Sequence, residues 1–271
     1  MRIRRIAILI DGGFYLKRLK HIVPEGNRSS PKAVAETTAF YCRNIVKYLT
    51  PKNNDPHHWR EHVYRFFFYD ALPYDATAHN PLSNLQIKFS DTEEYKFRHS
   101  LFEELRKRRN FALRLGKVEK EGDWNPSDPR TTKKLLRIKR FLDQFDENSK
   151  DLPQFTPAEK TEWESCLLTW KELTPESIRP GFRQKGVDMR IGVDIASLTL
   201  KQHVDTIILC TGDSDFVPAA KLARREGIEF LLDPLGQNIK DDLNEHIDGI
   251  VNGFPPLDKW TKSNSDDKVN K

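Results

Sequence analysis

The sequence predicts an α/β fold in which a mainly parallel β-sheet carries helices on both faces. Apolar segments of strand length alternate with segments of helical periodicity, a pattern typical of parallel sheets. The apolar segments are partly β-branched, as buried strands are. Two of them run directly into Asp and Gly, at 10–13 and at 210–215. Such strand ends form the edge where open α/β sheets bind ligands.

Five strands and five principal helices follow from these patterns. The strands are expected at Arg4–Ile10, Val63–Tyr69, Phe111–Val118, Asp205–Cys210 and Ile228–Leu232. The helices are expected at Phe14–His21, Ala33–Leu49, Phe97–Arg109, Asp188–Leu200 and Pro218–Glu226. Gly227 follows the last helix and suits the left-handed position beyond a helix end.

Residues 119–184 interrupt this rhythm, because they carry no strand signal and are too long for a plain loop. An amphipathic helix is expected around Thr131–Phe145, followed by a proline-rich part with Trp163 and Trp170. We interpret the segment as a largely helical insertion in one domain that covers residues 1–255. Residues 256–271 are polar and charged, so they are expected to be a disordered tail.

Composition indicates a soluble protein of the cytoplasm. Of the 271 residues, 37% are hydrophobic and 31% are charged, and no apolar run approaches the roughly 20 residues that span a bilayer. The three cysteines are widely spaced and suggest no disulfide framework. The formal net charge of +5 favours a polyanionic partner such as nucleic acid, although a merely basic surface has the same composition.

Three aspartates stand at predicted strand ends: Asp11 after the first strand, and Asp213 and Asp215 after the fourth. If these strands are neighbours, the carboxylates converge and repel one another, and a hard divalent cation is the simplest remedy. Paired divalent metals held by carboxylates activate water for phosphodiester hydrolysis. Helix capping by Ser214 or Asp215 is the alternative interpretation, but it does not explain why two strand ends both carry Asp beside Gly.

Asp188 is a fourth candidate, because it starts a predicted helix directly after Gly186-Val187. Asp194 lies six residues on, which is about 240° of net helical rotation, so both side chains cannot point the same way. We favour Asp188 as the inward group and leave Asp194 open between a fifth metal ligand and an ordinary helix acid.

Three short motifs, in their order and spacing, give the sequence a family resemblance. They are Ile10-Asp11-Gly12-Gly13-Phe14, Lys185-Gly186-Val187-Asp188 and Gly212-Asp213-Ser214-Asp215-Phe216. With them the chain resembles NYN-domain proteins of the PIN-like nuclease superfamily, and within them the LabA-like branch. The resemblance covers residues 4–116 and 184–251 and leaves the middle insertion unmatched.

The resemblance implies a three-layer α/β/α PIN-like domain with a metal-dependent ribonuclease site. Asp11, Asp188, Asp213 and Asp215 would hold Mg²⁺ or Mn²⁺, with Asp194 as the open fifth candidate. Many relatives place Asn where Phe14 stands, so any contact that this Asn makes is absent here.

Candidate RNA contacts surround the predicted acidic site or lie in basic runs. They are Lys17, Arg18, Lys185, Arg108, Arg109, Ser214 and Phe14. Basic clusters can follow a phosphate backbone, and an aromatic ring can stack on a base. A solvated helix face is the alternative for the basic run at 106–109, and core packing is the alternative for Phe14 or Tyr15.

We therefore predict a metal-dependent endoribonuclease that cleaves single-stranded or structured RNA. The main alternative is a non-catalytic RNA-binding regulatory protein on the same fold. A DNA-directed nuclease is a nearer rival. A haloacid-dehalogenase-like phosphatase is disfavoured, because its Asp pair lies on the first strand whereas this one lies on the fourth. A homodimer is left open.

Overall fold

The computed structural model describes residues 3–50, 54–144 and 155–260. The chain divides into two compact units. The first takes residues 1–73, 91–118 and 184–271, and the second takes residues 74–90 and 119–183. The second unit thus contains the predicted insertion together with a segment from earlier in the chain. None of the described helices is long and apolar enough to cross a membrane.

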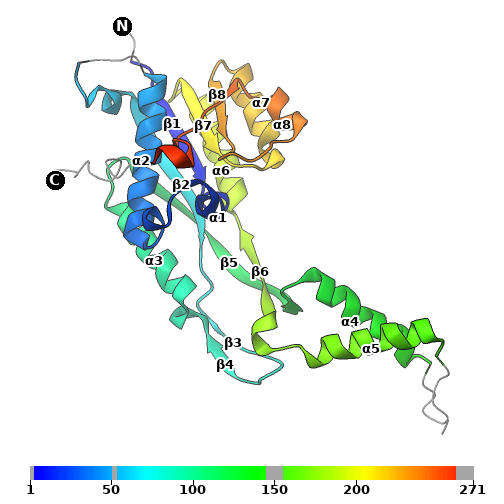
Figure 1. Cartoon of the computed structure of the whole chain (residues 1–271). Coiled ribbons are helices and arrows are strands. Elements are labelled where there is room, and N and C mark those ends of the chain that lie inside the picture. The colour runs from blue at the N-terminus through cyan, green and yellow to red at the C-terminus, as the bar shows by residue number, and fades with distance from the viewer. Residues whose placement is uncertain (1–2, 51–53, 145–154, 261–271) are drawn as a thin grey trace. The chain divides into compact units, whose positions relative to one another are not determined.

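A seven-stranded sheet forms the centre of the first unit (Figure 1). Its strands in spatial order are β6 (Ile178–Lys185), β5 (Phe111–Pro126), β2 (Val63–Leu72), β1 (Ile6–Asp11), β7 (Thr206–Cys210), β8 (Glu229–Asp233) and β9 (Gly249–Ile250). In this spatial order, every neighbouring pair from β5 through β2, β1, β7 and β8 to β9 is parallel. The prediction of a mainly parallel sheet is confirmed.

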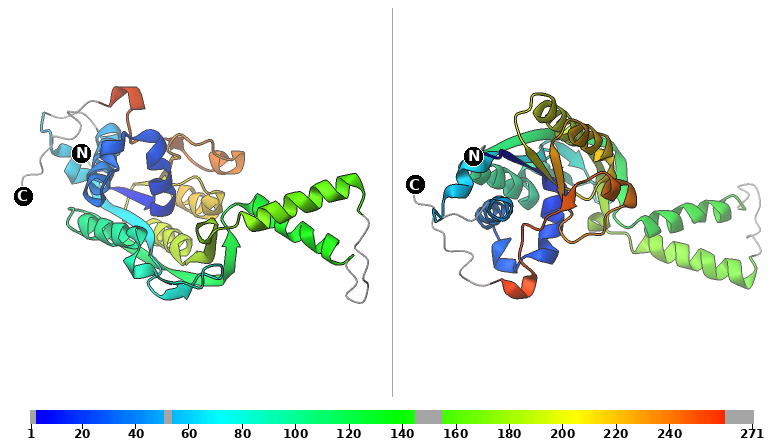
Figure 2. Two further views of the ribbon diagram at one scale, coloured as in Figure 1. Left: turned by 60° about the horizontal axis from the view of Figure 1, so that its bottom comes forward. Right: turned by 90° about the horizontal axis from the view of Figure 1, so that it is seen from above.

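Helices cover both faces of this sheet, which gives three layers (Figures 1 and 2). The helices of the first unit are α1 (Gly12–Ile22), α2 (Pro31–Leu49), α3 (Glu93–Arg106), α6 (Val187–Leu200), α7 (Val217–Arg225) and α8 (Asp241–Glu245). Alternate residues of β1 enter two separate cores: Ile8 packs with α1, α2 and α3, whereas Leu9 packs with α6 and α7. The period of two along the strand therefore creates the two buried faces.

Local sequence explains where several of these helices begin. The side chains of Asp11, Ser30 and Thr92 accept hydrogen bonds from first-turn amides of α1, α2 and α3. Each satisfies a backbone N–H that has no partner within its helix. Gly227 has a φ of +78° beyond the end of α7, as expected from its position.

The second unit contains the β3–β4 hairpin (Thr77–His79 and Gln86–Lys88) and two helices, α4 (Pro129–Leu142) and α5 (Pro157–Lys171). Parts of β5 and β6 belong to it as well. Phe141 of α4 packs edge-on against Trp163 of α5, with ring centroids 5.7 Å apart. A capping box of Thr156 and Glu159 begins α5.

The structure corrects two sequence-based expectations. Residues 119–184 were expected to lack strands, but β5 continues to Pro126 and β6 occupies Ile178–Lys185. Disorder was expected from residue 256 onward, but Leu257–Lys259 forms a short 3₁₀ helix. The Trp260 ring lies 5.5 Å from the ring of Phe40. Residues 261–271 of the predicted tail lie outside the described residues.

Candidate metal centre

The strand order reverses direction between the neighbouring strands β1 and β7, at the centre of the sheet. From β1 the chain builds outward to β2 and β5, and from β7 it builds outward in the other direction to β8 and β9. The crevice beyond the carboxyl ends of such a pair is the usual ligand site of open α/β sheets. Ile10 of β1 pairs with Cys210 of β7, so Asp11 and Thr211 stand side by side at that edge.

Asp11 is held at this edge by two hydrogen bonds. Its Oδ1 accepts from the Phe14 amide at 3.1 Å, and its Oδ2 accepts from the Thr211 hydroxyl at 3.4 Å. The pKa of Asp11 is raised to about 6, mainly by burial and in smaller part by the negative charges of Asp188 and Asp70, while its two hydrogen bonds oppose the rise. A cation at this site would therefore favour the ionised form.

Asp213 lies in the turn that follows β7. Its backbone N–H donates to the Thr211 hydroxyl at 3.3 Å, and its Oδ1 accepts from the Asp215 amide at 3.0 Å. Asp213 therefore caps the short 3₁₀ helix Ser214–Phe216. Asp213 can serve both as a cap and as a site residue, because no hydrogen bond of its second carboxylate oxygen is found among the described residues.

Asp188 occupies the first turn of α6, just after Gly186, which has a φ of +78°. Burial raises the pKa of Asp188, and Asp213 and Asp215 raise it further. Because Asp188 also acts on Asp11, the four predicted ligands form one electrostatic cluster drawn from β1, α6 and the turn after β7. We call Asp11, Asp188, Asp213 and Asp215 the acidic cluster.

The chemistry of the acidic cluster suits a hard divalent cation. All of its donors are carboxylate oxygens, which Mg²⁺ and Mn²⁺ prefer. Among the described salt bridges, no Lys or Arg pairs with any of its members. As placed, however, no three His, Cys, Asp or Glu side chains of the described residues are positioned to share one metal ion. The cluster is therefore brought together by the fold without being closed around a single point.

Asp194 does not belong to the acidic cluster, which corrects its candidacy as a fifth ligand. Its Oδ2 accepts from the Tyr69 hydroxyl at 2.8 Å and from Arg114 Nε at 3.0 Å. These partners lie on β2 and β5, so the six-residue spacing from Asp188 turns Asp194 toward the sheet. Its role is that of a partly buried ion pair.

Two further strand-end acids are buried. Asp70 on β2 is fully buried and forms an ion pair with Arg98 of α3. Burial raises the pKa of Asp70 while Arg98 opposes the rise. Asp233 at the end of β8 accepts from the amides of Leu235 and Gly253, both at 2.9 Å. These bonds make Asp233 an anchor for the loops that follow β8 and β9.

The predicted RNA contacts differ in burial and in the contacts that the structure gives them. The guanidinium of Arg18 donates to the carbonyl of Leu235 at 3.0 Å, and Arg108 pairs with Glu36 at 3.4 Å. Lys17, Lys185 and Arg109 are exposed. The exposed residues keep their predicted role as proposals, whereas Arg18 is largely a loop anchor.

Phe14 and Ser214 lie beside the acidic cluster. Phe14 is half-buried against the core, and a Cβ placed on Gly212 would come within 2.8 Å of its ring. Tyr15 is fully buried, as the core-packing interpretation expected. The Ser214 hydroxyl accepts from Lys240 Nζ at 3.2 Å.

Sequence reasoning missed three polar residues at this edge: Thr211, Gln184 and Lys240. A Cβ placed on Gly13 would lie 3.7 Å from Gln184 Oε1 and 3.5 Å from Asp11 Oδ1, so Gln184 reaches the neighbourhood of Asp11. Thr211 could have been found from the register of two neighbouring strands. Lys240 and Gln184 carry no local signal, because only the fold brings them to the site.

The fold and the site define an α/β protein with an acidic cluster at the switch point of a parallel sheet. The sequence model of the NYN domain family matches residues 136–248, a span that contains Asp188, Asp213 and Asp215. By this match, which covers less than half of its length, the chain is similar to NYN-domain proteins, in agreement with the resemblance carried by its motifs. Its placement in the LabA-like branch stays a prediction.

Two other comparisons add little to this assignment. The search among curated proteins found no match. A crystal structure of a protein of unknown function from Vibrio parahaemolyticus is similar at 14% sequence identity and a TM-score of 0.40. That similarity covers 94% of this chain and 99% of the other.

Proposed function

We propose that this protein is a metal-dependent ribonuclease that hydrolyses RNA phosphodiester bonds at the acidic cluster. The observation that carries the proposal is the electrostatic coupling of Asp11, Asp188 and Asp213 across the β1–β7 switch point. Four neighbouring carboxylates at one sheet edge repel both one another and a polyanionic substrate, so nucleic acid chemistry there needs a cation.

The acidic cluster would hold Mg²⁺ or Mn²⁺ through its carboxylate oxygens. When bound, such an ion supplies a Lewis acid that lowers the pKa of water and neutralises charge on a phosphate. The Thr211 hydroxyl fixes Asp11 and the turn at Asp213 together, so it orients two members of the cluster. The Phe14 amide, at the N-terminus of α1, stabilises the ionised form of Asp11.

The net charge of +5 and the exposed cations favour a nucleic acid substrate. Lys17 stands on α1, directly after the β1 edge, and Lys185 lies three residues before Asp188. Lys240 contacts Ser214 inside the turn that carries Asp213 and Asp215. We propose that these cations hold the phosphates on either side of the scissile bond.

A non-catalytic RNA-binding protein is the second candidate. It is favoured by one observation: the acidic cluster, as placed, does not offer three ligands to one ion among the described residues. If this candidate is correct, RNA binding does not require metal. Substitution of the cluster aspartates by asparagine then leaves RNA binding unchanged.

Incubation of the purified protein with end-labelled single-stranded RNA and with DNA of the same sequence separates the candidates. The reactions contain Mn²⁺, Mg²⁺ or EDTA and compare the wild type with Asp11→Asn, Asp213→Asn and the control Asp194→Asn. The proposal expects metal-dependent cutting of RNA that both cluster variants lose and the control keeps. RNA binding without cutting, unchanged by EDTA, supports the regulatory candidate. Preferred cutting of DNA would contradict the choice of substrate.

A further inference from the structure

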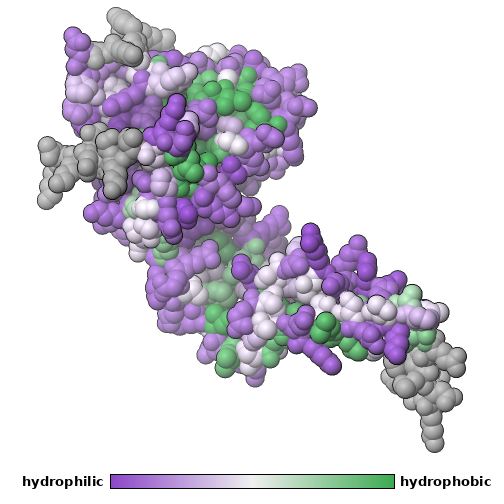
Figure 3. Space-filling view, in the orientation of Figure 1, coloured by the Kyte–Doolittle hydropathy of each residue, from purple (hydrophilic) through white to green (hydrophobic). Residues whose placement is uncertain are grey.

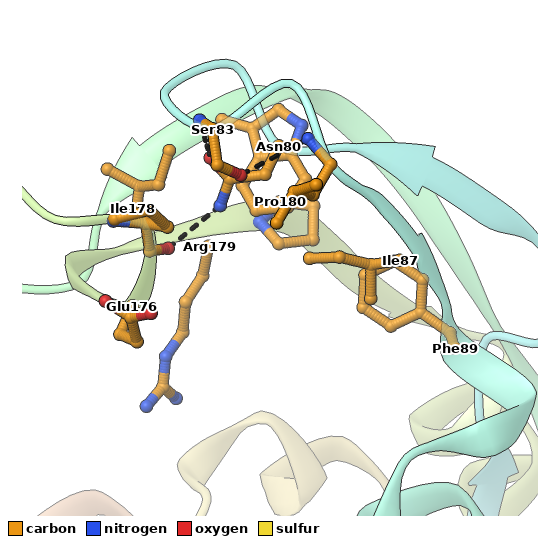
Figure 4. A pocket seen from close by; sticks show the side chains of 11 residues that line it. Asn80, Ser83, Ile87, Phe89, Glu176, Ile178, Arg179 and Pro180 are labelled. Carbon is orange, nitrogen blue, oxygen red and sulfur yellow. Dashed lines mark hydrogen bonds between the residues drawn. The ribbon is translucent and has the colours of Figure 1, made fainter.

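The second unit has a pocket of about 370 Å³ whose lining includes no member of the acidic cluster (Figure 4). Its walls come from the β3–β4 hairpin, β5, the 3₁₀ helix Pro175–Ser177 and β6, all within this unit. The lining is mostly apolar, with Leu85, Trp124 and Ile178 beside the polar side chains of Asn80, Glu176 and Arg179.

One wall of the pocket is fixed by Asn80, which is almost fully buried. Its Nδ2 donates to the carbonyl of Pro175 at 2.9 Å, as Figure 4 shows. Its Oδ1 accepts from the amides of Leu82 and Ser83. The hairpin loop and the 3₁₀ helix are therefore tied together, so the pocket is formed before any ligand arrives. A preformed site loses less ordering entropy on binding.

Apolar side chains reach solvent around this pocket. Leu82 is 46% exposed and Leu85 is 68% exposed. Figure 3 shows hydrophobic side chains at the surface over β3 and β4. Trp124 is half-buried on β5, and no hydrogen bond of its indole N–H is found among the described residues. The pocket therefore offers a planar aromatic ring with apolar surroundings to a flat ligand.

Positive charge stands at the mouth of the pocket. Arg179 is exposed and extends from the strand beside Pro180 into open space (Figure 4). No ion pair of Arg179 is found among the described residues. The amide of Ser127 donates to the carbonyl of Ser177 at 2.8 Å, so the turn before α4 is tied to the 3₁₀ helix that forms one wall. A ligand with a flat apolar part and an anionic part fits this arrangement.

We propose that this pocket binds one unpaired nucleobase of a single-stranded RNA, with Trp124 as its stacking face and Arg179 as the contact of an adjacent phosphate. The inference rests on the proposed function for its choice of RNA. The base supplies the flat π-face and the phosphodiester supplies the negative charge, whereas an apolar peptide side chain would leave Arg179 without a counterpart. Glu176 on the rim would repel a phosphate, so the strand must pass on the Arg179 side.

The test measures binding of a fluorescent 12-nucleotide single-stranded RNA in EDTA, so that cleavage plays no part. Trp124→Ala is compared with Trp124→Phe and with Trp170→Ala, since Trp170 is an exposed tryptophan of α5 outside the pocket. Circular dichroism confirms that each variant is folded. Stacking of one base predicts binding about tenfold weaker for Trp124→Ala, restored largely by Phe and unchanged in the control.

A second arm removes one base at a time from the RNA by abasic substitution. The proposal expects one position whose loss weakens binding to the wild type but not to Trp124→Ala, since both changes remove the same contact. A flat abasic series, or equal affinity of the Trp124 and Trp170 variants, would overturn it. If RNA binding depends on Trp124 but the wild type does not cut RNA with metal, the nuclease proposal is refuted and the pocket proposal stands. If the wild type cuts RNA but its RNA binding does not depend on Trp124, the pocket proposal is refuted and the nuclease proposal stands.

Discussion

Thr211 and Asp11 are joined across the central strand pair, because the Thr211 hydroxyl donates to Asp11 Oδ2 at 3.4 Å. The same hydroxyl oxygen accepts from the Asp213 amide at 3.3 Å. One buried side chain therefore couples the acid at the end of β1 to the acid that follows β7. This link explains how two members of the acidic cluster, 202 positions apart in the numbering, keep a fixed relation.

Thr211→Val should lower metal-dependent cleavage while leaving the fold intact. Valine has the shape of threonine but neither donates to Asp11 nor accepts from Asp213, and loss of such an orienting partner typically costs about 10–100-fold in metal affinity or activity. Thr211→Ser should retain most of the activity. The measurement is the cleavage rate as a function of Mn²⁺ concentration.

Thr206→Val provides the matched control, because Thr206 is an equally buried threonine at the opposite end of β7. Its hydroxyl contacts Arg4 and Glu229 far from the acidic cluster. Equal losses in the two valine variants would show that Thr211 acts through stability alone.

Gly12 and Gly13 should respond differently to alanine. A Cβ on Gly12 would come within 2.6 Å of both the Phe68 ring and the Tyr69 carbonyl oxygen, whereas one on Gly13 meets nothing closer than 3.5 Å. Overpacking of this kind costs about 1–3 kcal/mol, while alanine is favoured over glycine inside a helix by up to about 1 kcal/mol. Urea unfolding should therefore find Gly12→Ala destabilised and Gly13→Ala unchanged or stabilised. The reverse order would mean that α1 begins differently.

The two acids of α6 should separate in function and in stability. Asp194→Asn breaks the ion pair with Arg114, and since both groups are partly exposed the loss should be about 1 kcal/mol or less, with cleavage retained. Asp188→Asn should abolish cleavage. It should also raise the melting temperature in EDTA, because it removes one of several like charges. Lost cleavage in Asp194→Asn, at unchanged folding, would return Asp194 to the ligand set.

Asp233 should make the fold less stable as the pH rises from 4 to above 6. Burial raises the pKa of Asp233 to about 6, from an ordinary 3.8, so the folded chain holds this proton more tightly than the unfolded chain. The resulting stability is fully present below pH 3.8 and is lost as the pH rises through 6, by about 3 kcal/mol. Asp233→Asn should flatten this part of the profile.

Asp11 contributes in the same direction, since its pKa is also raised to about 6. The pH series is therefore measured by urea unfolding in the Asp11→Asn background, with and without Asp233→Asn. An unchanged slope after the second substitution would show that Asp233 is already ionised in the fold near pH 5.

The strands that could be predicted were those with a buried face. Ile6–Ile10 and Thr206–Cys210 are buried along their whole length, so their apolar runs identified them. The continuation of β5 past Val118 has mostly exposed polar side chains, such as Glu119 and Lys120, and therefore gave no hydrophobic pattern. β6 was missed for the same reason, because most of its residues are exposed.

Site residues could be predicted where a carboxylate directly follows an apolar strand. They could not be predicted where the role of a residue depends on partners that are distant in sequence. Asp11 and Asp213 follow apolar strands directly, which made them candidates. The partners that remove Asp194 from the site, Tyr69 and Arg114, lie 125 and 80 residues away in sequence. Helical rotation indicated that Asp188 and Asp194 diverge, but only the fold shows which of them faces the acidic cluster.

Direct measurement of Mn²⁺ binding tests the central claim, that the acidic cluster holds a divalent metal. Electron paramagnetic resonance titration of free Mn²⁺ compares the wild type with Asp11→Asn, Asp213→Asn and Asp194→Asn at pH 7.5. We expect the wild type and Asp194→Asn to bind Mn²⁺ alike, and each cluster variant to bind at least tenfold more weakly. Mn²⁺ binding that is absent from the wild type, or equal in all four proteins, would contradict the metal site and the nuclease that depends on it.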